Sequence, residues 1–193
     1  MCKNAEENLD IFLHQLMNQK VIGIGEIGLD YHWNSVGNLK GRDAREIQKK
    51  WFKYQLELAT KKDLPVSIHI RDAIDDALES FNHFSLIHGV IHCFSYGEKE
   101  LEKILEKGLY IGVGGTLTYK NNKELQEAVK KCPMNRILLE TDAPYLSPQP
   151  VKKQVNDSKN IEYVIEKICE LKEISREEVI EKTEENVKRL FGI

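Results

Sequence analysis

The sequence lacks the features of membrane-spanning, secreted and disulfide-bonded proteins. No apolar run approaches the roughly 18 residues that a membrane-spanning helix needs. The first ten residues, MCKNAEENLD, are polar and acidic, which is not the pattern of a signal peptide. The four cysteines are scattered without a CxxC pair, and so predict reduced thiols rather than a disulfide framework or a zinc site. We therefore expect a cytoplasmic protein, or a nuclear one in a eukaryote, with no membrane partner.

The chain also has little net charge. The net charge is -3 over 193 residues, which argues against a broad basic surface for nucleic acid but allows a small local phosphate site. Only five prolines and twelve glycines are present, so a collagen-like or long disordered segment is excluded. No GxGxxG turn or Walker loop occurs, which disfavours a nucleotide-binding sheet. A hydrophobic content of 41% predicts one globular domain over residues 1–193.

The hydrophobic pattern alternates between helix and strand periods along the whole chain. Helices are expected at residues 6–19, 43–62, 72–81, 98–108 and 122–132, and two more close the chain. Short strands, apolar over nearly their whole length, are expected at residues 21–25, 66–70, 89–94, 109–115 and 136–144. The last helix begins with a capping box, Ser175 with Glu178. Strands of this kind between helices predict a parallel α/β sheet, either doubly wound or a (β/α)8 barrel.

Polar side chains at the strand ends favour the barrel. Glu26, His69, His92 and Asp142 each come at or after the end of a different predicted strand, where barrel enzymes hold their functional residues. Five strands are present instead of eight, and the chain is shorter than the roughly 250 residues typical of a barrel. We therefore expect an incomplete TIM-type barrel of about five β/α units followed by helices.

These four residues also predict a metal site. Two carboxylates and two imidazoles suit Mg²⁺, Mn²⁺, Zn²⁺ or a related divalent ion, and Asp142 is the candidate base for a metal-activated water. Each residue has a structural alternative. Either histidine can be a hydrogen-bonded core residue, Glu26 can pair with Arg71 or a lysine, and Asp142 can be a turn residue. The coincidence of four ligand-type residues at four strand ends favours the metal site.

Four further residues are candidates for binding substrate. Arg71 follows His69 by two residues and can clamp a phosphate, or else pair with Glu26 or Asp72. Lys152 and Lys153 can contact a nucleic-acid backbone or be merely solvated. Tyr145, like Tyr31 and Trp33, can stack on a base or pack at the rim.

Several segments of the sequence, taken together, resemble those of a known protein family. GEIGLDYHW, LPVSIHIRDA, GVIHCFS, GLYIGVGGTLTYKN and RILLETDAPYLSP resemble, in order and spacing, the TatD family of metal-dependent deoxyribonucleases. The resemblance extends over essentially the whole chain. It implies an amidohydrolase-type barrel that hydrolyses DNA with divalent metal, often as a 3′–5′ exonuclease, with single-stranded DNA as the expected partner. It also implies that Glu26 bridges two metals, that His69 and His92 complete the second site, and that Asp142 binds the first metal and acts as base.

Two departures from the family pattern shape the expectations. The chain has no HxH pair, which in the family lies on the first strand and binds the first metal, so the first site is expected to be impaired and the first three units to be absent. In the loop after the last strand, only Asn156 matches the family well. The alternatives are a catalytically impaired barrel fragment or binding protein, or hydrolysis of another ester or amide. Open sheet edges predict self-association.

Overall fold

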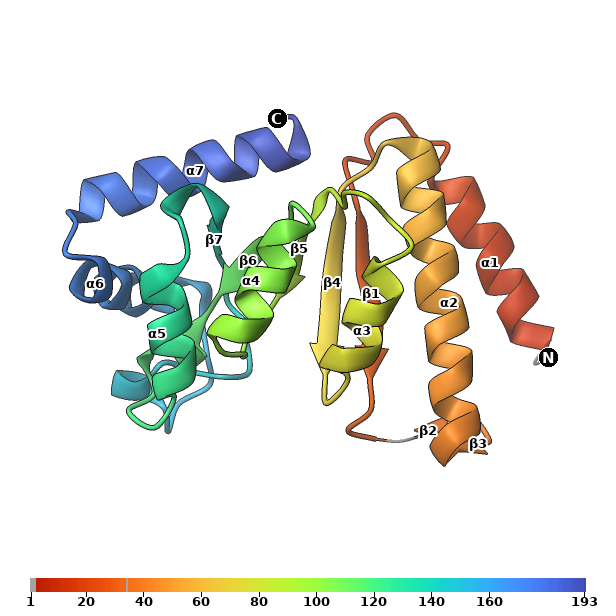
Figure 1. The fold of residues 1–193 in the computed structure, drawn as a ribbon, viewed down its shortest axis with the longest axis horizontal. Helices are drawn as coiled ribbons and strands as arrows, with labels where there is room; N and C mark the ends of the chain where they lie inside the picture. Colours follow the sequence, from red (N-terminus) through yellow and green to blue (C-terminus); the bar gives the residue numbers. More distant parts are fainter. Residues whose placement is uncertain (1–2, 34) are drawn as a thin grey trace.

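A parallel sheet forms the centre of the molecule (Figure 1). The computed structural model describes residues 3–33 and 35–193. The five strands run parallel in the order β1-β4-β5-β6-β7. They are β1 (Ile24–Asp30), β4 (Val66–Arg71), β5 (Gly89–His92), β6 (Tyr110–Val113) and β7 (Ile137–Leu139). This order, in which each strand lies beside the one before it, confirms the predicted α/β fold with five β/α units.

The helices form an outer layer that follows the sheet. They are α1 (Lys3–Gln15), α2 (Gly41–Lys62), α3 (Ile74–Phe81), α4 (Glu98–Glu106), α5 (Lys123–Lys131), α6 (Ile161–Lys172) and α7 (Arg176–Phe191). Each helix from α2 to α7 contacts the next one in the chain. Figure 1 shows α1 and α2 beside β1 at one end of the sheet, and α6 and α7 beside β7 at the other. No helix in the described part of the chain is long and apolar enough to cross a membrane.

Short 3-10 helices lie in the connections between these elements. They are η1 (Gly115–Thr118), η2 (Met134–Arg136), η3 (Gln149–Val151) and η4 (Ser158–Asn160). Two of them, η1 and η3, contact each other beside the carboxyl ends of the strands.

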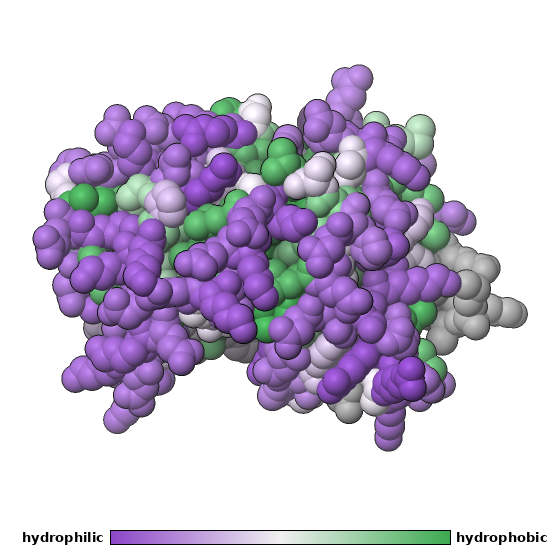
Figure 2. Space-filling model, viewed as in Figure 1, coloured by the Kyte–Doolittle hydropathy of each residue, from purple (hydrophilic) through white to green (hydrophobic). Residues whose placement is uncertain are grey.

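The period-two pattern of β4 separates an apolar face from a polar one. In β4, Val66, Ile68 and Ile70 are buried, whereas Ser67, His69 and Arg71 alternate with them on the opposite face. These buried side chains join the larger of two core clusters, which also holds Phe52 of α2 and Phe81 of α3. Alternation in β4 therefore packs its aliphatic residues against the helices and leaves its polar residues on the other face of the sheet. On the neighbouring strands that other face also holds buried apolar residues, which form a second cluster packed against α7. The outer surface is largely hydrophilic, with hydrophobic patches near its middle (Figure 2).

The prediction for the first strand was wrong in its bounds. β1 covers Ile24–Asp30, not residues 21–25, and Ile22 is 47% exposed. The alternating burial of Ile27 and Leu29 continues the strand beyond the apolar run. Its pairing with β4 is irregular between Ile24 and Ile27. Glu26 therefore lies inside this strand and not at its end.

Other bounds also differ from expectation, among them those of β7, which covers Ile137–Leu139 and not residues 136–144. α1 ends at Gln15 and not at residue 19, because Asn18 forms a turn in which its side chain accepts a hydrogen bond from the Lys20 N–H. A hairpin of β2 (Ser35–Val36) and β3 (Leu39–Lys40) was not predicted. Its two-residue Gly37–Asn38 loop is a recognised hairpin signal, so the sequence contained the information.

Two other predicted helix ends, the start of α7 and the end of α4, are confirmed. The Ser175 side chain accepts a hydrogen bond from the Glu178 N–H at the start of α7. Gly108 follows α4 with a φ of 79°, a left-handed conformation that suits glycine after a helix. Three cysteines (Cys93, Cys132 and Cys169) are free thiols, as expected, and Cys2 lies outside the described residues.

Candidate active site

One cavity gathers most of the predicted functional residues. It has a volume of about 700 Å³ and lies at the carboxyl ends of the parallel strands. Glu26, His69, His92 and Asp142, the four predicted metal ligands, all line it. Arg71 lines it as well. Residues separated by up to 116 positions in the chain thus share one cavity because parallel strands bring their carboxyl ends to one edge.

His92 is the centre of the site. As the last residue of β5, it directs its Nε2 to Asp142 Oδ1 at 2.8 Å and to Glu26 Oε1 at 3.5 Å. Its Nδ1 lies 2.9 Å from Glu140 Oε2. Hydrogen bonds to Asp142 and then to Glu140 raise the pKa of His92 to about 10, against the opposing effect of burial. The hydrogen bond from His92 in turn lowers the pKa of Asp142, which stays ionised at neutral pH.

Glu140 is the functional residue that was missed from the sequence. It follows β7 and holds two neighbouring groups of β5, because it contacts His92 with Oε2 and accepts a 2.5 Å hydrogen bond from the Cys93 N–H with Oε1. Gly112 makes room for this carboxylate, since a Cβ at that position would lie 2.2 Å from Glu140 Oε2. A carboxylate that holds the second nitrogen of a ligand-type histidine fixes its tautomer and orientation. The sequence signal was the acid in LLET, within an apolar strand.

His69 takes a different partner. Its Nε2 lies 3.2 Å from Asp30 Oδ2, at the end of β1, and the other oxygen of Asp30 accepts a hydrogen bond from the His32 N–H. Its register partner on the neighbouring strand is His92, so the two imidazoles leave the sheet side by side. Asp30 therefore holds His69 at the cavity wall, a role that we did not predict.

Cys93 adds a thiol to the cavity beside the carboxylates. Its backbone is left-handed, with a φ of 48°. Burial, followed by the charges of the nearby acids, raises the pKa of the Cys93 thiol. The group therefore stays protonated at physiological pH.

The four candidate substrate-binding residues lie in different places in the structure. Arg71 is exposed and forms no ion pair among the described residues, so the alternative pairings with Glu26 and Asp72 are not found. Tyr145 lines the cavity and is 74% exposed. Lys152 lies in a second cavity, described below, and Lys153 is exposed and lines neither.

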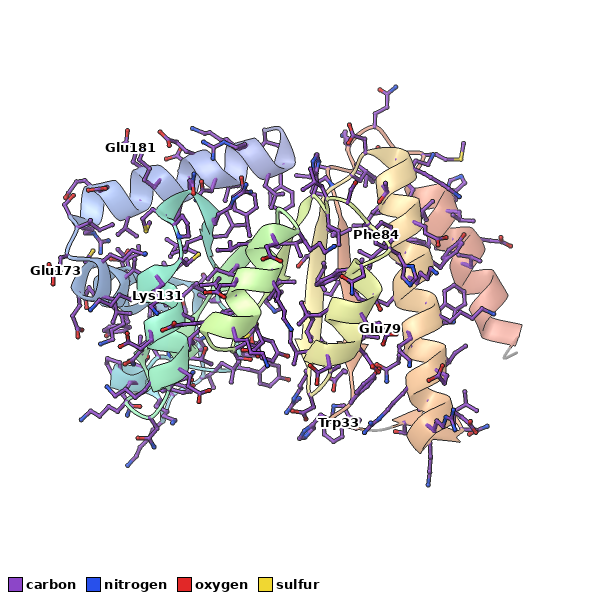
Figure 3. The ribbon with its side chains drawn as sticks, viewed as in Figure 1. Trp33, Glu79, Phe84, Lys131, Glu173 and Glu181 are labelled. Carbon is purple, nitrogen blue, oxygen red and sulfur yellow. The ribbon has the colours of Figure 1, made fainter. Side chains whose placement is uncertain are left out.

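Of the other aromatic candidates, only one remains open to solvent. Tyr31 is 7% exposed and donates a hydrogen bond to Asp76, so the suggestion that it stacks on a base was wrong. Trp33 is 72% exposed and projects from the edge at which β1 and β4 end (Figure 3). Asn156 is buried and holds the loop after β7, because its side chain donates a hydrogen bond to the Tyr145 carbonyl.

The donor set fits a divalent ion in its chemistry, with imidazole nitrogen and carboxylate oxygen. No group of three or more His, Cys, Asp or Glu side chains in the described ranges is arranged to hold an ion directly. His92 Nε2 and Asp142 Oδ1 contact each other at 2.8 Å, so both atoms would give up that contact if they held an ion.

Comparison with known proteins then assigns the chain. The family model described as TatD related DNase matches residues 2–192. The chain belongs to the TatD family. It is 38% identical over 191 residues to the uncharacterized metal-dependent hydrolase YabD of Bacillus subtilis, an alignment that covers 98% of this chain and 72% of that protein. With the uncharacterized metal-dependent hydrolase YcfH of Escherichia coli it shares 32% identity over 175 residues, 90% of this chain and 63% of that one.

Solved structures agree with the barrel-type fold. The crystal structure of YjjV, a TatD homologue from E. coli, matches with a TM-score of 0.81 and 32% identity over 95% of this chain and 71% of that one. A TatD family hydrolase from Entamoeba histolytica matches with a TM-score of 0.80 and 26% identity over 98% of this chain and 69% of that one. The resemblance stated from the motifs is therefore confirmed at the level of family and fold. The family is one of metal-dependent hydrolases, which supports a divalent metal as its cofactor.

Proposed function

We propose that this TatD-family chain hydrolyses phosphodiester bonds in single-stranded DNA with a divalent metal. The observation that carries the proposal is the convergence on one imidazole: Glu26 and Asp142 both reach His92 Nε2, within 3.5 Å and 2.8 Å. These groups lie in a cavity that is also lined by Arg71, which forms no ion pair within the described residues. The family description as a DNase supports DNA as the substrate.

Glu26, His69, His92 and Asp142 are the residues that would hold the metal. When bound, a divalent ion supplies a more acidic water and an electrophile for the phosphoryl oxygen. The carboxylate of Asp142, which stays ionised because of its lowered pKa, takes a proton from the attacking water. His92 is kept in place by Glu140, so Asp142 and Glu26 retain their common partner.

Arg71 orients the substrate in this proposal. Its guanidinium is free to form a two-point contact with the phosphate, and such contacts fix a planar anion better than a single ammonium does. Tyr145, at the exposed rim of the same cavity, offers a face on which a base can stack. Together they hold the scissile phosphate over Asp142.

A nuclease assay tests the proposal. The purified full chain is incubated with 5′-labelled single-stranded DNA and Mg²⁺ or Mn²⁺, and the label reports whether nucleotides leave from the 3′ end. We expect Asp142→Asn to reduce the rate by about 10² to 10⁴-fold, because it removes a general base. Asp10→Asn, a change to an exposed carboxylate on α1, should leave the rate unaltered.

Two chromogenic substrates separate the alternatives. Cleavage of bis-p-nitrophenyl phosphate but not of p-nitrophenyl acetate supports phosphodiester chemistry, and the reverse supports another ester as the substrate. Folded wild-type chain that degrades neither DNA nor the phosphodiester, with metal present, refutes the proposed function and supports the impaired-fragment alternative.

A further inference from the structure

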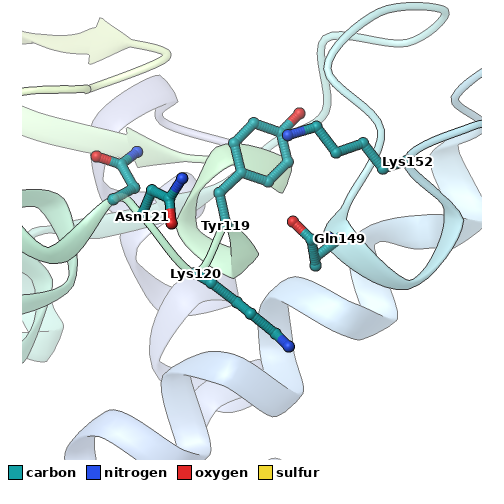
Figure 4. Close-up of a pocket in the computed structure, with 6 residues that line it drawn as sticks. Tyr119, Lys120, Asn121, Gln149 and Lys152 are labelled. Carbon is teal, nitrogen blue, oxygen red and sulfur yellow. The ribbon is translucent and has the colours of Figure 1, made fainter.

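A second cavity beside the active site carries positive charge without compensating acid. It has a volume of about 470 Å³ and contains two ammonium groups, three carboxamides and a phenol, but no carboxylate. Its lining residues are Tyr119, Lys120, Asn121, Asn122, Gln149 and Lys152 (Figure 4). In a chain with 31 acidic residues, a cavity of this composition is suited to an anion.

The two cavities share the same pair of chain segments. Along the first segment, Thr116 lines the active-site cavity and Tyr119, three residues later, lines the second one. Along the other, Leu146 lines the first cavity and Gln149 the second. Because the lining residues of the two cavities are only three positions apart on both segments, the cavities adjoin, and a single strand that leaves the first one can enter the second.

Hydrogen bonds tie these two segments together. The Tyr119 hydroxyl donates to the Ser147 carbonyl at 3.0 Å, and the Gln149 N–H donates to Thr118 Oγ1 at 2.7 Å. The spacing between the active site and the second cavity is therefore held by the protein and does not depend on a free loop.

Lys152 is positioned by an aromatic ring. Its Nζ lies 4.0 Å from the centre of the Tyr119 ring, a cation–π contact that is visible in Figure 4. The ring is itself anchored through its hydroxyl. Within the described part of the chain, the side-chain amides of Asn121 and Gln149 have no hydrogen-bond partner in the protein, so they are available to a ligand.

We propose that this cavity is a subsite for the nucleotide next to the scissile phosphate of a single strand. Lys152 and Lys120 contact the backbone phosphate, and the amides of Asn121 and Gln149 contact the sugar or base. Tyr119 is a positioning residue that acts through Lys152. The proposal rests on the proposed function for its substrate class, and it assigns to Lys152 a definite contact that Lys153, which is absent from the cavity lining, does not share.

The test compares a short and a long substrate. Bis-p-nitrophenyl phosphate occupies the active-site cavity alone, whereas a single-stranded oligonucleotide spans both. We expect Lys152→Ala to lower kcat/KM for the oligonucleotide by about three- to fivefold, through KM, as for the loss of one exposed charge contact. It should leave the small substrate within about twofold. Lys159→Ala, the matched loss of an exposed lysine in the same region that lines neither cavity, should change neither.

Tyrosine variants and binding measurements complete the test. Tyr119→Phe keeps the ring and should retain more oligonucleotide activity than Tyr119→Leu, which removes the cation–π contact. Fluorescence anisotropy with the labelled oligonucleotide in EDTA should show a salt dependence whose slope falls by about 0.7 in Lys152→Ala, the value for one lost phosphate contact.

The outcomes separate this subsite from the proposed function. If wild type cleaves neither substrate, the proposed function fails, and the anisotropy comparison alone decides the subsite. Equal effects of Lys152→Ala and Lys159→Ala on binding, or an equal loss on both substrates, refute the subsite. Weaker binding confined to Lys152→Ala supports it.

Discussion

Glu140→Gln isolates the contribution of the carboxylate that holds His92. The substitution keeps the length and shape of the side chain but replaces the ionised oxygens with an amide. The carboxylate now contacts His92 Nδ1 at 2.9 Å and accepts from the Cys93 N–H at 2.5 Å. The amide of the variant can satisfy the Cys93 N–H through its carbonyl oxygen, but it presents a donor to His92 Nδ1 and no longer stabilises positive charge on the ring.

The size of the effect follows from the two roles of Glu140. Loss of a carboxylate behind a histidine ligand lowers metal affinity by about 10- to 100-fold, or about 1.4 to 2.7 kcal/mol. In the metal-free chain, Glu140 is the second cause, after Asp142, that raises the pKa of His92 to about 10. The variant should therefore titrate its His92 at a lower pH than wild type, while Asp142 still keeps that pH above 6.5, the ordinary value.

Two measurements check this reasoning. Titration calorimetry with Mn²⁺ gives the affinity, and an NMR pH titration of the imidazole signals in EDTA gives the pKa. Glu106→Gln, at an exposed position on α4, is the matched control and should change neither. An unaltered Mn²⁺ affinity in Glu140→Gln, or a wild-type His92 that titrates near 6.5, would refute the assigned role.

Three further predictions concern stability and assembly. Because the pKa of His92 is raised, its contribution to stability in EDTA is complete below pH 6.5 and is lost as the pH rises toward about 10. Thermal melting from pH 6.5 upward should therefore show a Tm that falls with pH. In Asp142→Asn the Tm should depend less on pH. Gly112→Ala should lower the free energy of unfolding by about 1–3 kcal/mol, measured with denaturant, because the new Cβ clashes with Glu140. Gly97→Ala should lower it far less, because its new Cβ would stand 3.6 Å from the nearest atom. Equal losses in the two variants would contradict this prediction. We also propose that the edges at β1 and β7 associate, so sedimentation should show larger species between about 1 and 100 µM, and a monomer throughout would reject it.

The strand and helix order was predictable because its signal is local. Each strand is a short apolar run between helical patterns, and alternation of the two periods indicates parallel β/α units. The bounds of β1 were less accessible, since its outer residues alternate and its glycines interrupt the apolar run. Where the strand ended was decided by pairing with β4, a non-local interaction that a single window of sequence does not contain.

The sequence predicted which residues form the site better than it predicted which side chains contact one another. Glu26, His69, His92 and Asp142 could be chosen because acids and histidines are costly among buried strands unless they have partners. The identity of those partners depends on residues distant in the chain. Glu140 contacts a residue 48 positions away, so only the folded sheet reveals that it supports His92. The metal-ligand roles themselves stay predictions until a metal is bound.

The contact between Glu26 and His92 depends on curvature of the sheet. The two residues come from β1 and β5, which are separated by β4 and so by about 10 Å in a flat sheet. Their side chains nevertheless approach to 3.5 Å, because both are long enough to lean across β4 and a concave polar face brings them closer. Gly28 permits the close approach of β1 to β4, because it has a φ of 146° and a Cβ there would lie 1.8 Å from the carbonyl oxygen of His69. The interior of a barrel is such a concave face. The curvature of the sheet therefore accounts both for the fold class and for the contact between residues of different strands in the site.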